Sequence, residues 1–136
     1  MKYMEVKANP YNLSPTYLRL RRDVSVEPLA VDDAFWSKLA AGDLGSFHNE
    51  YLVTSHTMES DWDHWEMHPN GDEMVCLLAG NVTFLLEEGD GVSTVELTED
   101  GAFTLVPKGT WHTAKVKAPS RMLFITAGEG TRHRPV

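Results

Sequence analysis

The chain has 136 residues and a mass of 15.3 kDa, which is about the size of one folded domain. Its apolar fraction of 42% and charged fraction of 24% are ordinary for a globular protein and argue against extended disorder. The single cysteine, Cys76, excludes an internal disulfide and a zinc site built from several thiolates. The formal net charge of −8 disfavours binding to the phosphate backbone of a nucleic acid.

The distribution of apolar and basic residues bears on localisation and partners. No segment approaches the ~20 apolar residues that a membrane-spanning helix requires, and the first residues contain no apolar stretch of signal-peptide length. We therefore expect a cytoplasmic protein with no membrane contact. The one short basic run, residues 19–22, is expected on a solvated edge strand, so no nucleic-acid partner is predicted.

Residues 1–45 are predicted to form an N-terminal arm that contains one short helix. Residues 17–21 alternate apolar and basic side chains, as a short strand would. The helix can be capped by Asp32 or Asp33 and is expected to end before Gly42. We expect it to pack on the outside of the following domain through three apolar residues at helical spacing: Phe35, Trp36 and Leu39.

From residue 46 onward the apolar pattern changes to a period of two. Short alternating segments are separated by turns rich in Gly and Pro, with no helical segment between them, which predicts an all-β antiparallel sandwich or barrel over residues 46–127. Residues 128–136 are expected to form a C-terminal tail. The expected strands cover residues 50–57, 61–68, 73–79, 81–87, 92–97, 102–106, 111–117 and 121–127.

The strand predicted over residues 61–68 carries an unusual set of side chains on one face. Because side chains alternate along a strand, four residues share that face: Trp62, His64, Glu66 and His68. Imidazole and carboxylate groups inside a barrel must be paired or hydrated. A turn then brings Glu73 back beside His68, and His112 follows a later turn among small residues. These positions are candidates for a site.

Two spaced motifs in this region resemble those of the cupin superfamily. The first is His68-x4-Glu73-x6-Gly80, and the second is Gly101-x5-Pro107-x-Gly109-x2-His112. Over about residues 46–127 the chain is therefore similar to a small single-domain cupin. The resemblance implies an antiparallel double-stranded β-helix, the jelly-roll barrel, which is open at one end and holds a metal ion inside.

By position, the resemblance implies that His68, Glu73 and His112 bind a divalent ion such as Fe, Mn, Ni or Zn, and mixed imidazole and carboxylate ligands suit these ions. The first motif of the family normally reads His-x-His, but Glu66 stands at its first position here. Three arrangements are open. Glu66 is the fourth ligand, or His64 reaches in, or three residues bind the ion and Glu66 acts as a general base. A barrel that has lost its metal is a further alternative.

These features favour a metal-dependent enzyme of the oxygenase or isomerase type that acts on an unidentified small organic molecule. In this hypothesis Glu66 is the catalytic carboxylate, and Trp62 and His64 line the pocket. The alternative is a non-catalytic barrel that binds or senses a small molecule. A homodimer is expected because Trp65 and Trp111 point outward and would otherwise be exposed. The histidines outside the motifs are expected at the surface: His48, His56 and His133.

Overall fold

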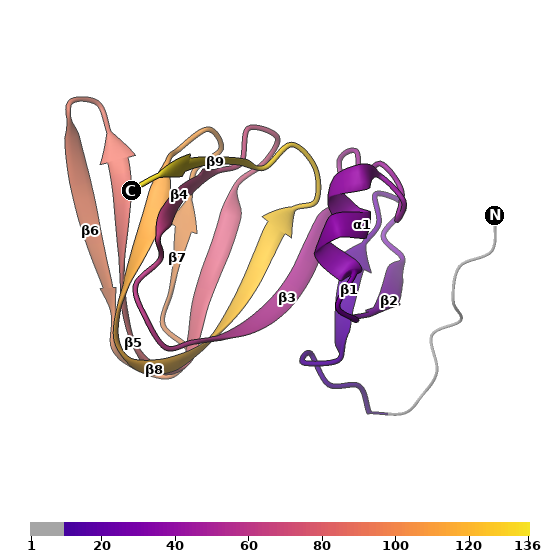
Figure 1. Cartoon of the computed structure of the whole chain (residues 1–136), viewed down its shortest axis with the longest axis horizontal. Coiled ribbons are helices and arrows are strands. Elements are labelled where there is room, and N and C mark those ends of the chain that lie inside the picture. The colour runs from indigo at the N-terminus through magenta and orange to yellow at the C-terminus, as the bar shows by residue number, and fades with distance from the viewer. Residues whose placement is uncertain (1–9) are drawn as a thin grey trace.

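The computed structural model describes residues 10–136, so residues 1–9 of the predicted arm lie outside the described residues. The predicted all-β antiparallel fold with one short helix is confirmed (Figure 1). Within residues 10–136, no helix is long and apolar enough to cross a membrane. The elements are β1 Thr16–Leu20, β2 Val26–Ala30, α1 Phe35–Ala41, β3 Tyr51–Met58, β4 His64–Met67, β5 Glu73–Glu88, β6 Gly91–Leu97, β7 Phe103–Val106, β8 His112–Ala127 and β9 Arg132–Pro135.

The two longest strands, β5 and β8, form the frame of the barrel. They pair in antiparallel fashion along β5 from Met74 to Leu86. Both strands bend sharply where they cross from one wall of the barrel to the other (Figure 1). β3 extends one wall by pairing with residues 120–127 of β8, and β6 extends the other by pairing with residues 82–88 of β5. This arrangement gives the two walls of the predicted jelly roll.

The turn expected at Gly80 is a bend within one continuous strand. The register between β5 and β8 shifts between Leu77 and Val82, and Gly80 has a φ of 116°. A Cβ atom at Gly80 would lie 2.7 Å from the Cα atom of Ser120 on the neighbouring strand, so only glycine fits there. Because β8 stays paired alongside, the chain changes direction without reversing. The separate strands expected before and after Pro119 are likewise one strand, β8.

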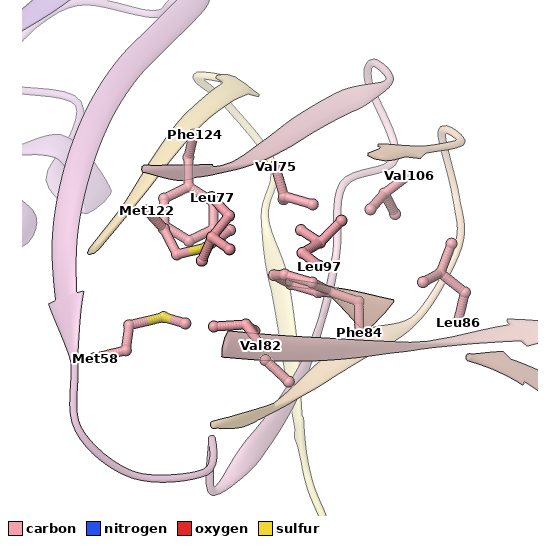
Figure 2. Packing of buried hydrophobic residues seen from close by; sticks show 11 residues of the cluster. Met58, Val75, Leu77, Val82, Phe84, Leu86, Leu97, Val106, Met122 and Phe124 are labelled. Atoms are coloured by element: carbon pink, nitrogen blue, oxygen red, sulfur yellow. The ribbon is translucent and has the colours of Figure 1, made fainter. Parts of the chain in front are cut away.

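The main hydrophobic core fills the space between the walls. Alternate residues of β5 point into it, and Val75, Leu77, Val82 and Phe84 are fully buried. Figure 2 shows these side chains packed against Met122 and other residues from the facing strands. This alternation is what the period of two in the sequence predicted. The core occupies one end of the barrel interior and leaves the other end for polar side chains.

The N-terminal arm is more regular than expected, because β1 and β2 form a hairpin that pairs with β3. A second core lies under α1, where Phe35 is buried and meets the Tyr17 ring edge-on at 5.2 Å. The Asp32 carboxylate accepts a hydrogen bond from the N–H of Ala34, and Gly42 ends the helix with a φ of 81°. The helix therefore packs at the side of the barrel (Figure 1).

The basic run does not lie on a solvated edge strand, and the physical reason is a buried ion pair. β1 lies between β2 and β3, and Arg19 is only 7% exposed. Its Nε donates to Glu50 Oε1 over 2.7 Å, and its guanidinium lies 4.2 Å from the centre of the Phe47 ring. Pairing with a carboxylate makes burial of the charge acceptable.

The predicted C-terminal tail contains a strand, β9, which pairs with β4. β9 places the Arg134 guanidinium 5.3 Å from the ring centre of Trp65 and 4.5 Å from that of Trp111. Both tryptophans are therefore half-buried within the chain. The expectation that they would be exposed without a second subunit was wrong, because a segment that showed no strand pattern covers them.

Candidate metal site and cavity

The structure brings the three residues of the two motifs together at one end of the barrel. His68 directly follows β4, Glu73 is the first residue of β5, and His112 is the first residue of β8. β4 pairs with β8 through Glu66 and His112, and the turn after His68 returns the chain to Glu73. Glu73 Oε1 lies 3.3 Å from His68 Nε2 and 3.0 Å from His112 Nε2.

Hydrogen bonds on the far side of each imidazole fix its orientation. His68 Nδ1 bonds to the Thr131 hydroxyl over 2.9 Å, and His112 Nδ1 donates to the Thr110 carbonyl over 3.1 Å. The second bond requires the proton of a neutral His112 to be on Nδ1, which leaves the lone pair of Nε2 free. Metal-binding histidines are commonly held by such a second hydrogen bond.

The carboxylate of Glu73 is held in the same way. Its Oε2 accepts a hydrogen bond from the Thr126 hydroxyl over 2.7 Å, so Oε1 is the oxygen that faces the imidazoles. Neither Thr126 nor Thr131 was found from the sequence. Thr126 could be placed only by knowing the register of β8 against β5, and Thr131 lies in a segment with no motif.

Burial and charge act in opposite directions on this cluster. Glu73 is 3% exposed and His112 is 0% exposed. Burial opposes the charged carboxylate, but His112 and His68 outweigh it and lower the pKa of Glu73 to about 2. Burial also opposes a protonated imidazole, but the Glu73 carboxylate outweighs that effect and raises the pKa of His112. In the absence of another cation, these groups stabilise one another's charged forms.

Glu66 lies between this inner cluster and a second group of side chains near the surface. Its Oε1 is 3.7 Å from His68 Nε2, whereas its Oε2 is 2.7 Å from His64 Nε2 and 3.8 Å from His133 Nε2. Glu66, His68 and His112 offer ligand atoms within 4.8 Å of one another, and His64, Glu66 and His133 form a separate group of the same size. Glu66 thus reaches the inner cluster, and His64 faces the outer one.

His64 is held by its neighbours on both sides. Its ring stacks on Trp62 at 5.3 Å with an interplanar angle of 5°, and its Nδ1 lies 2.9 Å from the Asp63 carboxylate. Burial lowers the pKa of His64, but hydrogen bonds to Glu66 and Asp63 outweigh burial and raise it. Asp63, His64 and Glu66 therefore form a chain of hydrogen bonds from the exposed surface to the interior.

A cavity of about 840 Å³ adjoins the cluster and is lined by both Trp62 and His64. Its polar lining includes Glu66, His68 and Glu73. Its apolar and aromatic lining comes from α1 and the barrel: Trp36, Leu39, Leu52, His56 and Phe124. Its volume falls within the range of about 300–1,000 Å³ that is typical of small-molecule sites.

Two histidines expected at the surface take part in this region. The ring of His56 is half-buried, lies 5.7 Å from that of Trp36 and 5.4 Å from that of Phe124, and lines the cavity. Burial lowers the pKa of His56, so this part of the cavity lining holds a neutral imidazole at neutral pH. His133 is exposed, as expected, but the pairing of β9 with β4 brings it to Glu66.

No protein-family model and no curated protein matches the sequence. Several solved structures are similar to it. Hydroquinone 1,2-dioxygenase from Sphingomonas sp. TTNP3, with 4-hydroxybenzoate bound, is 21% identical with a TM-score of 0.51 over 59% of this chain and 60% of that chain. A mutant of oxalate decarboxylase from Bacillus subtilis is 17% identical with a TM-score of 0.51 over 63% and 24% of the two chains. A cupin-2 domain protein from Shewanella frigidimarina NCIMB 400 is 19% identical with a TM-score of 0.49 over 57% and 70%.

The chain has the cupin fold. The resemblance inferred from the two motifs is thereby confirmed at the level of fold. In this cupin barrel, three buried atoms make no hydrogen bond of good geometry within residues 10–136, although Glu73 Oε1 lies within 3.3 Å of both imidazole nitrogens: His68 Nε2, Glu73 Oε1 and His112 Nε2. Buried polar atoms are rarely left unpaired, and one ion bound at about 2.0–2.2 Å by each atom would bring such ligands roughly 3 Å apart. The residues present therefore fit a divalent metal ion.

Proposed function

We propose that this cupin is a divalent-metal-dependent enzyme of the oxygenase or isomerase type, acting on a small organic molecule bound in the cavity. The observation that carries the proposal is the convergence of three buried ligand atoms that make no hydrogen bond of good geometry among the described residues, those of His68, Glu73 and His112, beside a cavity of about 840 Å³. Imidazole and carboxylate donors suit Fe, Mn, Ni or Zn. The fold supports many reactions and does not choose between them.

The chain's own residues would divide the work as follows. His68, Glu73 and His112 hold the ion, which when bound supplies Lewis acidity or a site for O2. Glu66 is either the fourth ligand or a general base, because its Oε1 faces His68 and its Oε2 bonds to His64 over 2.7 Å. Through His64, a proton on Glu66 can pass toward Asp63 at the surface, so the carboxylate can be reset after each proton transfer.

The similar structures support a small-molecule site without identifying the molecule. One of them is a dioxygenase with 4-hydroxybenzoate bound, and another is a decarboxylase of oxalate. Both share this fold at low sequence identity. Their reactions differ from each other, so the choice between oxygenase and isomerase chemistry has to come from turnover measurements on this chain.

Metal content tests the proposal directly. The purified protein should contain a stoichiometric divalent ion by plasma mass spectrometry, and His68→Ala or His112→Ala should remove it. His48→Ala is the matched control, because His48 is exposed and its ring bonds to Glu129, away from the inner cluster. Undiminished metal in both site variants, or none in the native preparation, contradicts the proposal.

Turnover separates the enzyme from the alternative, a barrel that binds or senses a metabolite. The enzyme predicts metal-dependent product formation, and Glu66→Gln should then reduce turnover more than it reduces metal content. A ligand that raises the melting temperature without being consumed would favour the sensor. Equal metal loss in Glu66→Gln and Glu73→Gln would make Glu66 a ligand instead of a base.

We also propose that the protein is cytoplasmic and forms a homodimer. Two exposed apolar residues of β7 support the dimer, since Phe103 and Leu105 are 55% and 59% exposed. Adjacent exposed apolar residues on a sheet often mark an interface. Light scattering at the mass of one chain would contradict the dimer.

A further inference from the structure

Apart from the histidines, the charged side chains that line the cavity are all negative. Three acidic residues line it, namely Glu66, Glu73 and Glu129, and the described lining residues include no lysine or arginine. Small anions are usually recognised by arginine, lysine or backbone N–H groups. The cationic groups of the cavity lining are therefore limited to histidines, and no permanently charged side chain of the described lining is placed to recognise a carboxylate or phosphate group.

A bound divalent ion does not change this balance. Glu73 lies within the donor cluster, and Glu66 stands 3.7 Å from His68 Nε2. Two carboxylates together offset the two positive charges of the ion, so the ion and these two carboxylates carry no net charge. If a neutral histidine stood in place of Glu66, the ion and its ligands would together keep one positive charge. With Glu66 at that position they keep none. Whether or not an ion is bound, the site disfavours anions.

Part of the cavity lining is a wall of rings. The rings of Trp36, His56 and Phe124 contact one another in series, with centroid distances of 5.7 and 5.4 Å. Trp36 is 48% exposed on α1, although it lines the cavity, so much of its ring is open to solvent. Aromatic rings pair favourably with other rings beyond the gain from area alone, by about 0.5–1.5 kcal/mol. An exposed tryptophan beside a cavity is thus suited to a flat ligand.

We propose that the substrate is an uncharged molecule with a planar ring, which packs against the wall of Trp36, His56 and Phe124 while a polar substituent faces Glu66 and His68. This inference rests on the proposed function in one respect, because the bound molecule is a substrate only if the protein is an enzyme. The binding preference itself depends only on the cavity. The N-terminal helix α1 accordingly takes part in selecting the ligand, because it supplies Trp36.

A set of matched small probes tests the two parts of the proposal. Benzamide is uncharged and planar, benzoate has nearly the same shape with a negative charge, and cyclohexanecarboxamide keeps the amide but loses the flat ring. Binding of each is measured by ligand-observed NMR to the Zn2+-loaded protein and to the protein treated with a chelator. We expect benzamide to bind about tenfold more tightly than benzoate and about threefold more tightly than cyclohexanecarboxamide. Tighter binding of benzoate to either form, or of the cation benzylamine to the Zn2+-loaded protein, overturns the proposal.

Substitution locates the binding on the ring wall. Trp36→Ala should weaken benzamide binding by about three- to tenfold and leave Zn2+ uptake unchanged. Val92→Ala is the matched control, since Val92 is also a large exposed apolar residue but lies outside the cavity and outside the proposed dimer surface. Equal affinities in the two variants overturn the proposal. Loss of metal binding with retention of the benzamide preference would instead count against the proposed enzyme and leave the ligand class standing.

Discussion

Two buried clusters of charged residues lie at different places in this molecule, and they differ in how completely they are paired. In the first, Arg19 Nε and Nη2 both contact Glu50 Oε1, Arg19 Nη1 donates to the Leu44 carbonyl, and Glu50 Oε2 accepts from the N–H of Arg22. In the second cluster, one atom of each member makes no hydrogen bond of good geometry within the described residues: His68 Nε2, Glu73 Oε1 and His112 Nε2.

The difference separates a structural ion pair from a ligand site. Charges that satisfy one another fully gain nothing from a further partner. The Arg19–Glu50 pair instead holds β1 against the segment before β3. Charges and lone pairs that converge without hydrogen bonds of good geometry stabilise the fold less than they stand to gain from a bound cation. Removal of one member should therefore have opposite consequences in the two places: unfolding in the first, and loss of metal in the second.

The largest effect is expected at the structural pair. Arg19→Ala leaves the Glu50 carboxylate buried, at 5% exposure, without its partner. Breaking such a buried pair costs about 3–5 kcal/mol of unfolding free energy. Urea unfolding would measure this, and metal content per folded molecule should not change. If the variant does not fold, the double variant Arg19→Met/Glu50→Leu should recover much of the stability, because no charge is left unpaired.

An ion pair elsewhere on the barrel provides the control for this effect. Arg134 and Glu87 form an ion pair whose side chains are 37% and 38% exposed. Glu87→Gln should therefore cost less than about 1 kcal/mol. Equal losses from Arg19→Ala and Glu87→Gln would show that burial of the first pair does not distinguish it, and the comparison would fail.

A smaller effect is expected when the support of a metal ligand is removed. Thr126→Val deletes the hydroxyl that holds Glu73 Oε2 but keeps the shape of the side chain. Loss of such a second contact commonly weakens metal binding about 10–100-fold, and Zn2+ competition with a chelating dye would measure it. Thr83→Val is the matched control, because the Thr83 hydroxyl is buried without a partner. Equal Zn2+ affinities in the two variants would remove Thr126 from the site.

The barrel and two members of its inner cluster, His68 and Glu73, were predictable from the sequence for local physical reasons, whereas His112 was assigned through its resemblance to the second cupin motif. A period of two identifies strands because side chains alternate, and the spacing of His68 and Glu73 across one turn brings them together in any hairpin. Strand continuity was not predictable at Gly80, since a glycine marks a bend and a reversal equally well. Only the pairing with β8 decides between the two.

The parts that were missed all depend on long-range pairing. Arg19 looked like a surface residue because its partner, Glu50, lies in a distant segment. His56 joins the cavity only because α1 packs over it and brings Trp36 to its ring. His133 meets Glu66 only because β9 pairs with β4, and the segment of β9 has no apolar alternation to predict a strand.

The subtlest difference between the two clusters is in their response to pH. An arginine does not lose its proton in the accessible range, so the Arg19–Glu50 pair should stay intact as the pH rises. His112 does titrate. In the metal-free protein its pKa is raised above 6.5, because Glu73 Oε1 at 3.0 Å outweighs the opposing effect of burial. Glu73→Gln removes that charge, and the pKa of His112 should then fall, which NMR titration of the imidazole would show.

The raised pKa also fixes the sign of the effect on stability. A group whose pKa is higher in the folded state contributes its full stabilisation below the unfolded value and loses it as the pH rises through the folded value. Chelator-treated protein should therefore lose unfolding free energy as the pH rises above 6.5, and Glu73→Gln should flatten this dependence. His64 acts in the same direction in both proteins, so only the difference between them reports on His112. Identical pH profiles would mean that Glu73 and His112 are not coupled, and the inner cluster would then lack the electrostatic basis for binding a cation.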